Sequence, residues 1–179
     1  MGAGPQDGDD GKTPGEEQDR AGRFGDRQEN QQGNRQEAWI EGIRVVADSN
    51  RIIAALIKDS TTRRILESPS FSFYAPEFMR SEVEKHREEI SSKGKMGEGE
   101  FDLLFSLLLT RVKILPRANY QHLIECLKRD IPDQKDLPYL AVCTLVEADG
   151  IWTHDPHFLR QKRVKVLTNY DLLRYAREH

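Results

Sequence analysis

The chain has 179 residues and carries 27 basic against 30 acidic side chains, so its formal net charge at pH 7 is −3. This length allows one domain and a terminal extension, and the near balance of charge argues against a strongly basic nucleic-acid-binding domain. The sequence holds no apolar run of transmembrane length and no signal-peptide pattern. We therefore expect a soluble, cytoplasmic protein that does not enter a membrane.

Composition divides the chain near residue 38. Residues 1–38 contain eight of the thirteen glycines, many polar residues, and nine acidic against five basic side chains. A segment with so few large apolar side chains cannot bury enough surface to offset the entropy that it loses on ordering. We predict a disordered polar tail over residues 1–38 and a folded, nearly neutral domain over residues 39–179.

The first half of the domain alternates between strand and helix patterns. A β-branched run at residues 43–47 predicts a buried strand, and apolar spacing predicts helices at 51–58 and 61–67. An alternating aromatic run at 71–74 predicts the second strand, which Pro76 ends. Helical spacing then covers residues 77–90 and 101–110, with a Gly- and Lys-containing loop at 91–99 between them.

The second half continues the alternation. The pattern predicts a strand at residues 112–115, a helix at 120–128, a mostly apolar and therefore buried helix at 136–147, strands at 150–153 and 164–167, and a closing helix at 169–178. Short strands separated by helices are typical of βαβ units. We therefore expect an α/β fold with a central parallel sheet of about five strands, flanked by helices.

Acidic residues fall where such a sheet would bind a ligand. Asp48 follows the first strand, Asp155 comes soon after the fourth strand, and Asp136 opens the helix that leads into the fourth strand. Because strand carboxyl ends and helix amino ends share one rim of a parallel sheet, these side chains are candidates for the same crevice. Glu82, two turns into the helix after the second strand, reaches it if that helix leans over the rim.

Each acid also has a simpler interpretation. Asp48 or Asn50 can cap the next helix, Asp136 and Asp155 each stand just before a proline as N-cap residues do, and Glu82 can be a solvated surface charge. A cluster of carboxylates, however, raises its own pKa values by mutual repulsion unless a cation is present. Hard divalent ions such as Mg²⁺ bind carboxylates together with water and phosphate oxygens. Both interpretations stay open at this point.

The segments that contain these acids resemble, in order, four blocks of the PIN-domain nuclease family, whose best-known bacterial and archaeal members are VapC-like toxins. The matching segments read VVADSN at Val45–Asn50, YAPEFMRSEVE at Tyr74–Glu84, DLPYLAVC at Asp136–Cys143 and GIWTHDPHF at Gly150–Phe158. The likeness covers about residues 43–168 and no core acid is missing. Glu84 lies close enough to Glu82 to be confused with the second acid. The departures are His154, where other polar residues are common, and Cys143, where Ala is frequent.

The resemblance implies a Mg²⁺- or Mn²⁺-dependent endoribonuclease that hydrolyses single-stranded RNA. Asp48, Glu82, Asp136 and Asp155 would hold one or two ions, which would activate water and neutralise the scissile phosphate. Four residues would support them: Asn50 or Ser49 would position a ligand or the attacking water, Thr153 would hold the Asp155 carboxylate, and Asp133 would bind a second ion or start the turn.

The resemblance also implies partners, namely a second copy in a homodimer and a small antitoxin protein. Two alternatives stay open: an RNA-processing nuclease that is not a toxin, and a catalytically weak module that binds RNA or protein. Candidate cations for substrate phosphates are Arg63, Arg64, Lys93, Lys95 and those of residues 160–165.

Other ligand chemistries have little support in the sequence. His154 and His157 lack the further Cys or His that a zinc site needs, and there is no phosphate-binding glycine motif. Cys126 and Cys143 are expected to be small buried side chains, and Trp152 to belong to the core.

Overall fold

The computed structural model describes residues 1, 42–58, 60–129 and 133–178, and the chain divides into two compact units, Met1–Gln36 and Glu37–His179. The predicted tail falls almost entirely outside the described residues, so its disorder stays a prediction. The elements below all belong to the second unit.

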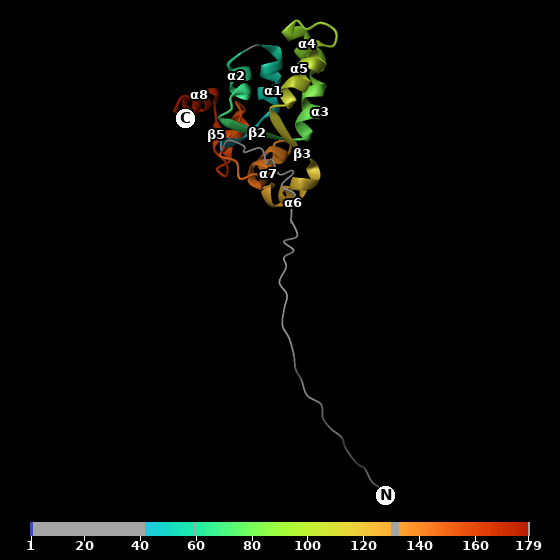
Figure 1. Ribbon diagram of the computed structural model, residues 1–179, viewed down its shortest axis with the longest axis vertical. Coiled ribbons are helices and arrows are strands. Elements are labelled where there is room, and N and C mark those ends of the chain that lie inside the picture. Colours follow the sequence, from blue (N-terminus) through green and yellow to red (C-terminus); the bar gives the residue numbers. More distant parts are fainter. Residues whose placement is uncertain (2–41, 59, 130–132, 179) are drawn as a thin grey trace, which may run out of the picture. The chain divides into compact units, whose positions relative to one another are not determined.

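Five parallel strands form one sheet (Figure 1). They are β1 (Ile43–Ala47), β2 (Phe71–Pro76), β3 (Val112–Leu115), β4 (Gly150–Trp152) and β5 (Val166–Leu167). Their order across the sheet is β3-β2-β1-β4-β5, and each neighbouring pair is parallel. The predicted α/β fold with a central parallel sheet is therefore confirmed.

Helices cover both faces of the sheet, and Figure 1 shows α1 to α5 on one side and α6 and α7 on the other. The helices are α1 (Ser49–Ile57), α2 (Thr61–Glu67), α3 (Phe78–Lys85), α4 (Arg87–Gly94), α5 (Glu100–Leu109), α6 (Arg117–Leu127), α7 (Leu137–Leu145) and α8 (Asn169–Glu178), with a short 3₁₀ helix, η1 (Pro156–Arg160). α7 packs on β1, β2 and β4, whereas α1 packs against α3, α4 and α5. Both faces of the parallel sheet are thus buried, as such sheets require.

The order of the strands reverses between β1 and β4. From β1 the chain moves outward to β2 and β3, and it then returns through α6 and α7 to place β4 on the other side of β1. The backbone N–H of Asp48 donates to the carbonyl of Trp152 (3.2 Å), so the two strands stay paired up to their carboxyl ends. In open α/β sheets this reversal creates the crevice in which ligands bind.

The core forms where the β-branched and aromatic runs of the strands meet the apolar helix faces. Val45, Val46 and Ala47 are fully buried, and the ring of Trp152 packs 5.5 Å from that of Phe73. The indole N–H of Trp152 donates to Asn169 Oδ1 (2.8 Å), which satisfies its one donor inside the protein. Trp152 is therefore a core residue, as predicted.

Two local predictions were wrong. The helix predicted at residues 77–90 breaks at His86, whose φ of −103° and ψ of 10° separate α3 from α4, and α4 then continues through the first part of the predicted loop. Cys126 is exposed, because it lies on the outer face of α6, whereas Cys143 is buried as expected; neither forms a disulfide.

Among the described residues, no helix combines the length and the apolar character that crossing a membrane requires.

The absence of a side chain at Gly150 allows β5 to pack closely against the start of β4. It begins β4, and a Cβ atom placed there would lie 2.6 Å from Leu167 Cδ1 and 2.8 Å from the Lys165 carbonyl oxygen. We expect Gly150→Ala to lower the free energy of unfolding by about 1–3 kcal/mol, because β5 must shift to make room. Gly97→Ala is the control, since its Cβ would meet nothing closer than 3.6 Å. Equal urea midpoints for the two variants would contradict this assignment.

Candidate metal centre

Asp48 is a buried carboxylate at the end of β1, with only 4% of its surface exposed. Its Oδ2 accepts hydrogen bonds from Thr153 Oγ1 (2.6 Å) and Asn50 Nδ2 (3.3 Å), and its Oδ1 accepts one from Ser49 Oγ (3.2 Å). The carboxylate makes no capping bond to α1. The capping interpretation therefore fails for Asp48, which is instead held by neutral donors in one orientation.

Thr153 supports a different acid from the one predicted. Its hydroxyl donates to Asp48 and accepts from the backbone N–H of Asp155 (2.9 Å), so it does not hold the Asp155 carboxylate. The reason is that a hydroxyl can donate only one hydrogen bond, and here the buried carboxylate of Asp48 accepts it. The Asp155 carboxylate instead caps η1, because its Oδ1 accepts from the backbone N–H of His157 (2.8 Å). The capping interpretation therefore holds for one oxygen of Asp155.

Asp136 is the least satisfied acid of the site. It precedes α7 without capping it, and its Oδ2 is buried with no hydrogen-bond partner among the described residues. Burial raises the pKa of Asp136 to about 7, with further contributions from the negative charges of Asp133, Asp155 and Asp48. A carboxylate in this state is costly to ionise unless a cation approaches it.

Glu82 reaches the same rim from α3. The buried Tyr139, on α7, donates its hydroxyl proton to Glu82 Oε2. Burial raises the pKa of Glu82, the charge of Asp48 raises it further, and the hydrogen bond from Tyr139 opposes both. Helix α3 thus leans over the rim as the sequence interpretation required, and all four predicted acids lie at the carboxyl edge of the sheet.

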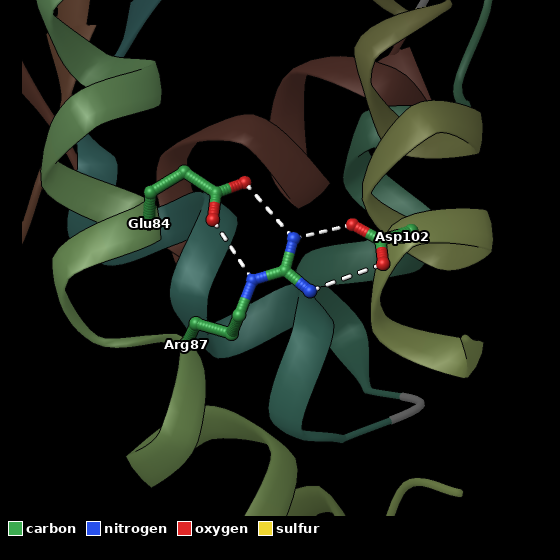
Figure 2. Close-up of polar contacts among 3 residues, drawn as sticks. All are labelled: Glu84, Arg87 and Asp102. Carbon is green, nitrogen blue, oxygen red and sulfur yellow. Dashed lines mark hydrogen bonds and ion pairs between the residues drawn. The ribbon is translucent and has the colours of Figure 1, made fainter. Parts of the chain in front are cut away.

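Glu84, the neighbour that could be confused with Glu82, belongs to a separate surface network. Figure 2 shows the Arg87 guanidinium between the carboxylates of Glu84 and Asp102, with Arg87 Nε 2.9 Å from Glu84 Oε2 and Nη1 3.0 Å from Asp102 Oδ2. Arg87 also stacks 4.3 Å over the Phe101 ring. This network ties α3 and α4 to α5 on the exposed side, so Glu84 is engaged away from the rim.

A further set of possible ligands lies beside Asp136. One ligand atom each from Asp133, Asp136 and His157 lie within 4.8 Å of one another. The sequence interpretation assigned no role to His157, because it sought a Cys or a further His as its partner, whereas the partners are carboxylates. Asp48, Glu82 and Asp155 are not members of this compact set, although the charges of Asp48 and Asp155 act on Asp136.

These features fit a divalent cation. Carboxylate oxygens with one imidazole suit Mn²⁺ or Mg²⁺ better than a thiolate-preferring metal. A cation would fill the unsatisfied position at Asp136 Oδ2 and would remove the repulsion that raises the pKa of Asp136. The residues present are therefore suited to hold such an ion.

The model of the PIN domain family matches residues 46–170, a span that includes all four acids. The chain belongs to the PIN domain family. PIN domains are generally metal-dependent nucleases. The fold of this PIN domain is similar to that of a solved structure described as VapBC2 from Rickettsia felis bound to a DNA fragment from their promoter. That match has a TM-score of 0.52 and 15% identity, and it covers 70% of this chain and 98% of the other. A comparison with curated proteins gives no match.

The unsatisfied state of Asp136 predicts an effect on stability. Because its pKa rises from 3.8 to about 7 on folding, its contribution favours folding below pH 4 and is lost as the pH rises through 7. We expect Asp136→Asn, without the charge, to melt several degrees above the metal-free wild type at pH 8 and by a smaller margin at pH 5, where only part of the contribution is lost. Thermal melts in chelator test this, with Glu98→Gln, an exposed charge, as control. An unchanged melting temperature at pH 8 would be evidence against the repulsion described here.

Proposed function

We propose that this PIN domain is a Mg²⁺- or Mn²⁺-dependent endoribonuclease that cleaves phosphodiester bonds of single-stranded RNA in the cytoplasm. Asp48, Glu82, Asp136 and Asp155 would be its metal-binding and catalytic residues. The observation that carries the proposal concerns the buried Oδ2 of Asp136, which has no hydrogen-bond partner in the described part of the chain and lies among other carboxylates at the strand-order reversal. A surface cluster of acids without such a role would be solvated or paired.

The side chains around the acids fix their orientation before any ligand arrives. Thr153, Ser49 and Asn50 hold Asp48, and Tyr139 holds Glu82. When bound, a divalent ion would lower the pKa of a water molecule and neutralise the charge of the scissile phosphate. The protein contributes carboxylates that are held in place at the carboxyl edge of the sheet, so these side chains need little reorganisation during the reaction.

The proposal includes partners. The similarity to VapBC2 supports a role as the toxin of a toxin–antitoxin pair, with a small antitoxin protein as its partner. We also propose that the chain assembles as a homodimer. A PIN nuclease that processes RNA without being a toxin has the same active site. Arrest of growth on expression, relieved by the product of a small neighbouring gene, would favour the toxin; growth without arrest would favour the processing enzyme.

Cleavage of labelled single-stranded RNA by the purified chain with Mg²⁺ or Mn²⁺ tests the enzyme. We expect cleavage to stop with EDTA and to fall at least 100-fold in Asp48→Asn, which keeps the shape but loses the charge. Glu84→Gln is the matched control, because it removes the same charge from the network outside the site. DNA of the same sequence serves as the second substrate, and equal cleavage of it would overturn the specificity for RNA.

Other outcomes of this assay are also informative. Activity that survives Asp48→Asn would mean a contaminating nuclease or a different site. No cleavage, together with no Mn²⁺ binding by calorimetry, would overturn the enzyme and favour a PIN-fold module that only binds RNA or protein.

Thr153→Val tests the support of Asp48. The change is nearly isosteric, but it removes a donor from Asp48 Oδ2 and an acceptor from the Asp155 backbone N–H. We expect Mn²⁺ affinity or cleavage to fall about 10- to 100-fold, as for other groups that orient metal ligands. The control is Thr110→Val, where an exposed hydroxyl bonds to the Leu107 carbonyl. Equal Mn²⁺ affinity in the two variants would refute this role of Thr153.

A further inference from the structure

An arginine and a histidine meet across the crevice beside the acids. Arg51 lies in the first turn of α1, three residues after Asp48, and His154 follows Thr153 beyond β4. Arg51 Nη1 is 3.0 Å from His154 Nδ1. Because β1 and β4 are neighbours at the strand-order reversal, the contact connects the two walls of the crevice on the side covered by α1.

Arg51 is not fully satisfied by the protein. Its side chain is half-buried, and its Nε is buried with no hydrogen-bond partner among the described residues. In the described part of the chain, no carboxylate lies within ion-pair distance of it. Burial lowers the pKa of Arg51 and the charge of Asp48 opposes this, but a guanidinium stays protonated in proteins. A buried, charged donor without an acceptor is costly, so an anion is the ligand that it favours.

Asp48 does not provide that acceptor. Its two oxygens are occupied by the hydroxyl and amide donors of Ser49, Asn50 and Thr153. The charge of Asp48 therefore acts on Arg51 without a direct bond. His154 accepts from Arg51, because arginine has no lone pair to offer, and this bond fixes one end of the guanidinium; its other nitrogens have no hydrogen-bond acceptor among the residues that the structure describes.

Two of the cations suggested by the sequence, Arg63 and Lys93, lie elsewhere. The Arg63 guanidinium donates to the carbonyl oxygen of Ala55 near the far end of α1, and Lys93 donates to Glu89. Gly94, at the end of α4, also lies close to the Ile57 carbonyl at that end of α1. Arg51 is at the opposite end of α1, beside the acids, where a polyanion must approach a rim of negative charge.

We infer that Arg51 binds a backbone phosphate of the RNA next to the scissile one, and that His154 is a positioning residue for Arg51. This inference rests on the proposed function. A guanidinium presents a planar set of donors that matches phosphate oxygens, and it offsets the repulsion between the substrate and the acids. The scissile phosphate would be bound by the ion that the acids hold. Arg51 would therefore bind a phosphate next to it.

The experiment compares Arg51→Gln with Arg177→Gln, which removes the same charge from an exposed position near the end of α8. Cleavage of single-stranded RNA is measured with Mn²⁺ at several salt concentrations, and Mn²⁺ affinity by calorimetry. We expect Arg51→Gln to raise KM about 10- to 100-fold with kcat little changed, as for loss of a charged hydrogen bond. The slope of log kcat/KM against log salt should become shallower by about 0.7, the value for one phosphate contact on a single strand. Arg177→Gln should change neither quantity.

Three further variants separate binding from folding. Arg51→Lys keeps the charge, so it should retain the salt slope while its KM rises by less. His154→Asn places an amide oxygen near the position of Nδ1 and should restore the KM that His154→Ala raises. Mn²⁺ affinity and melting temperature should stay near those of the wild type in all these variants.

The outcomes distinguish this inference from the proposed function. If the wild type neither cleaves RNA nor binds Mn²⁺, the proposed function is wrong. If the wild type cleaves but Arg51→Gln has the KM and salt slope of Arg177→Gln, then Arg51 does not bind phosphate. Loss of Mn²⁺ affinity and thermal stability together in both Arg51 variants would show a structural role and would also overturn the inference.

Discussion

The carboxylates of Asp48, Asp136 and Asp155 lie at one rim of a parallel sheet, and burial together with the charges of its neighbours raises the pKa of Asp136. The protein supplies hydrogen bonds to these three carboxylates unevenly. Asp48 receives three side-chain donors and Asp155 receives a backbone N–H, whereas Asp136 Oδ2 receives none among the described residues. The cost of ionisation is thus concentrated on one carboxylate, which is the arrangement expected of a site shaped for a cation.

The parallel topology is the reason that these groups meet. Asp48 and Thr153 are 105 residues apart in sequence, yet β1 and β4 place them side by side because the chain reverses its direction across the sheet between these strands. The pairing of β1 with β4 continues to the last residue of each strand. The same reversal sets Arg51 opposite His154. One feature of connectivity therefore determines which side chains can act together.

The strands and the four acids could be predicted from the sequence because both depend on local pattern. β-Branched runs such as Ile43–Ala47 identify buried strands, and an acid directly after a strand lies on the carboxyl rim. The break at His86 could not be predicted, because the helical spacing of apolar residues continues through it. The bond from Thr153 to Asp48 and the one from Tyr139 to Glu82 join distant segments, so no local signal indicates them. Arg51 was missed because an arginine in a helix is usually solvated.

The hydrogen bond between Tyr139 and Glu82 joins α7 and α3, two helices from opposite faces of the sheet. Each partner would be left with a buried polar group if the other were replaced. A descendant of this chain that lost Glu82 would therefore gain stability by exchanging the tyrosine for phenylalanine. The acid and the phenol are expected to change as a pair during evolution, and the residue at position 139 should then record whether an ancestor retained its second acid.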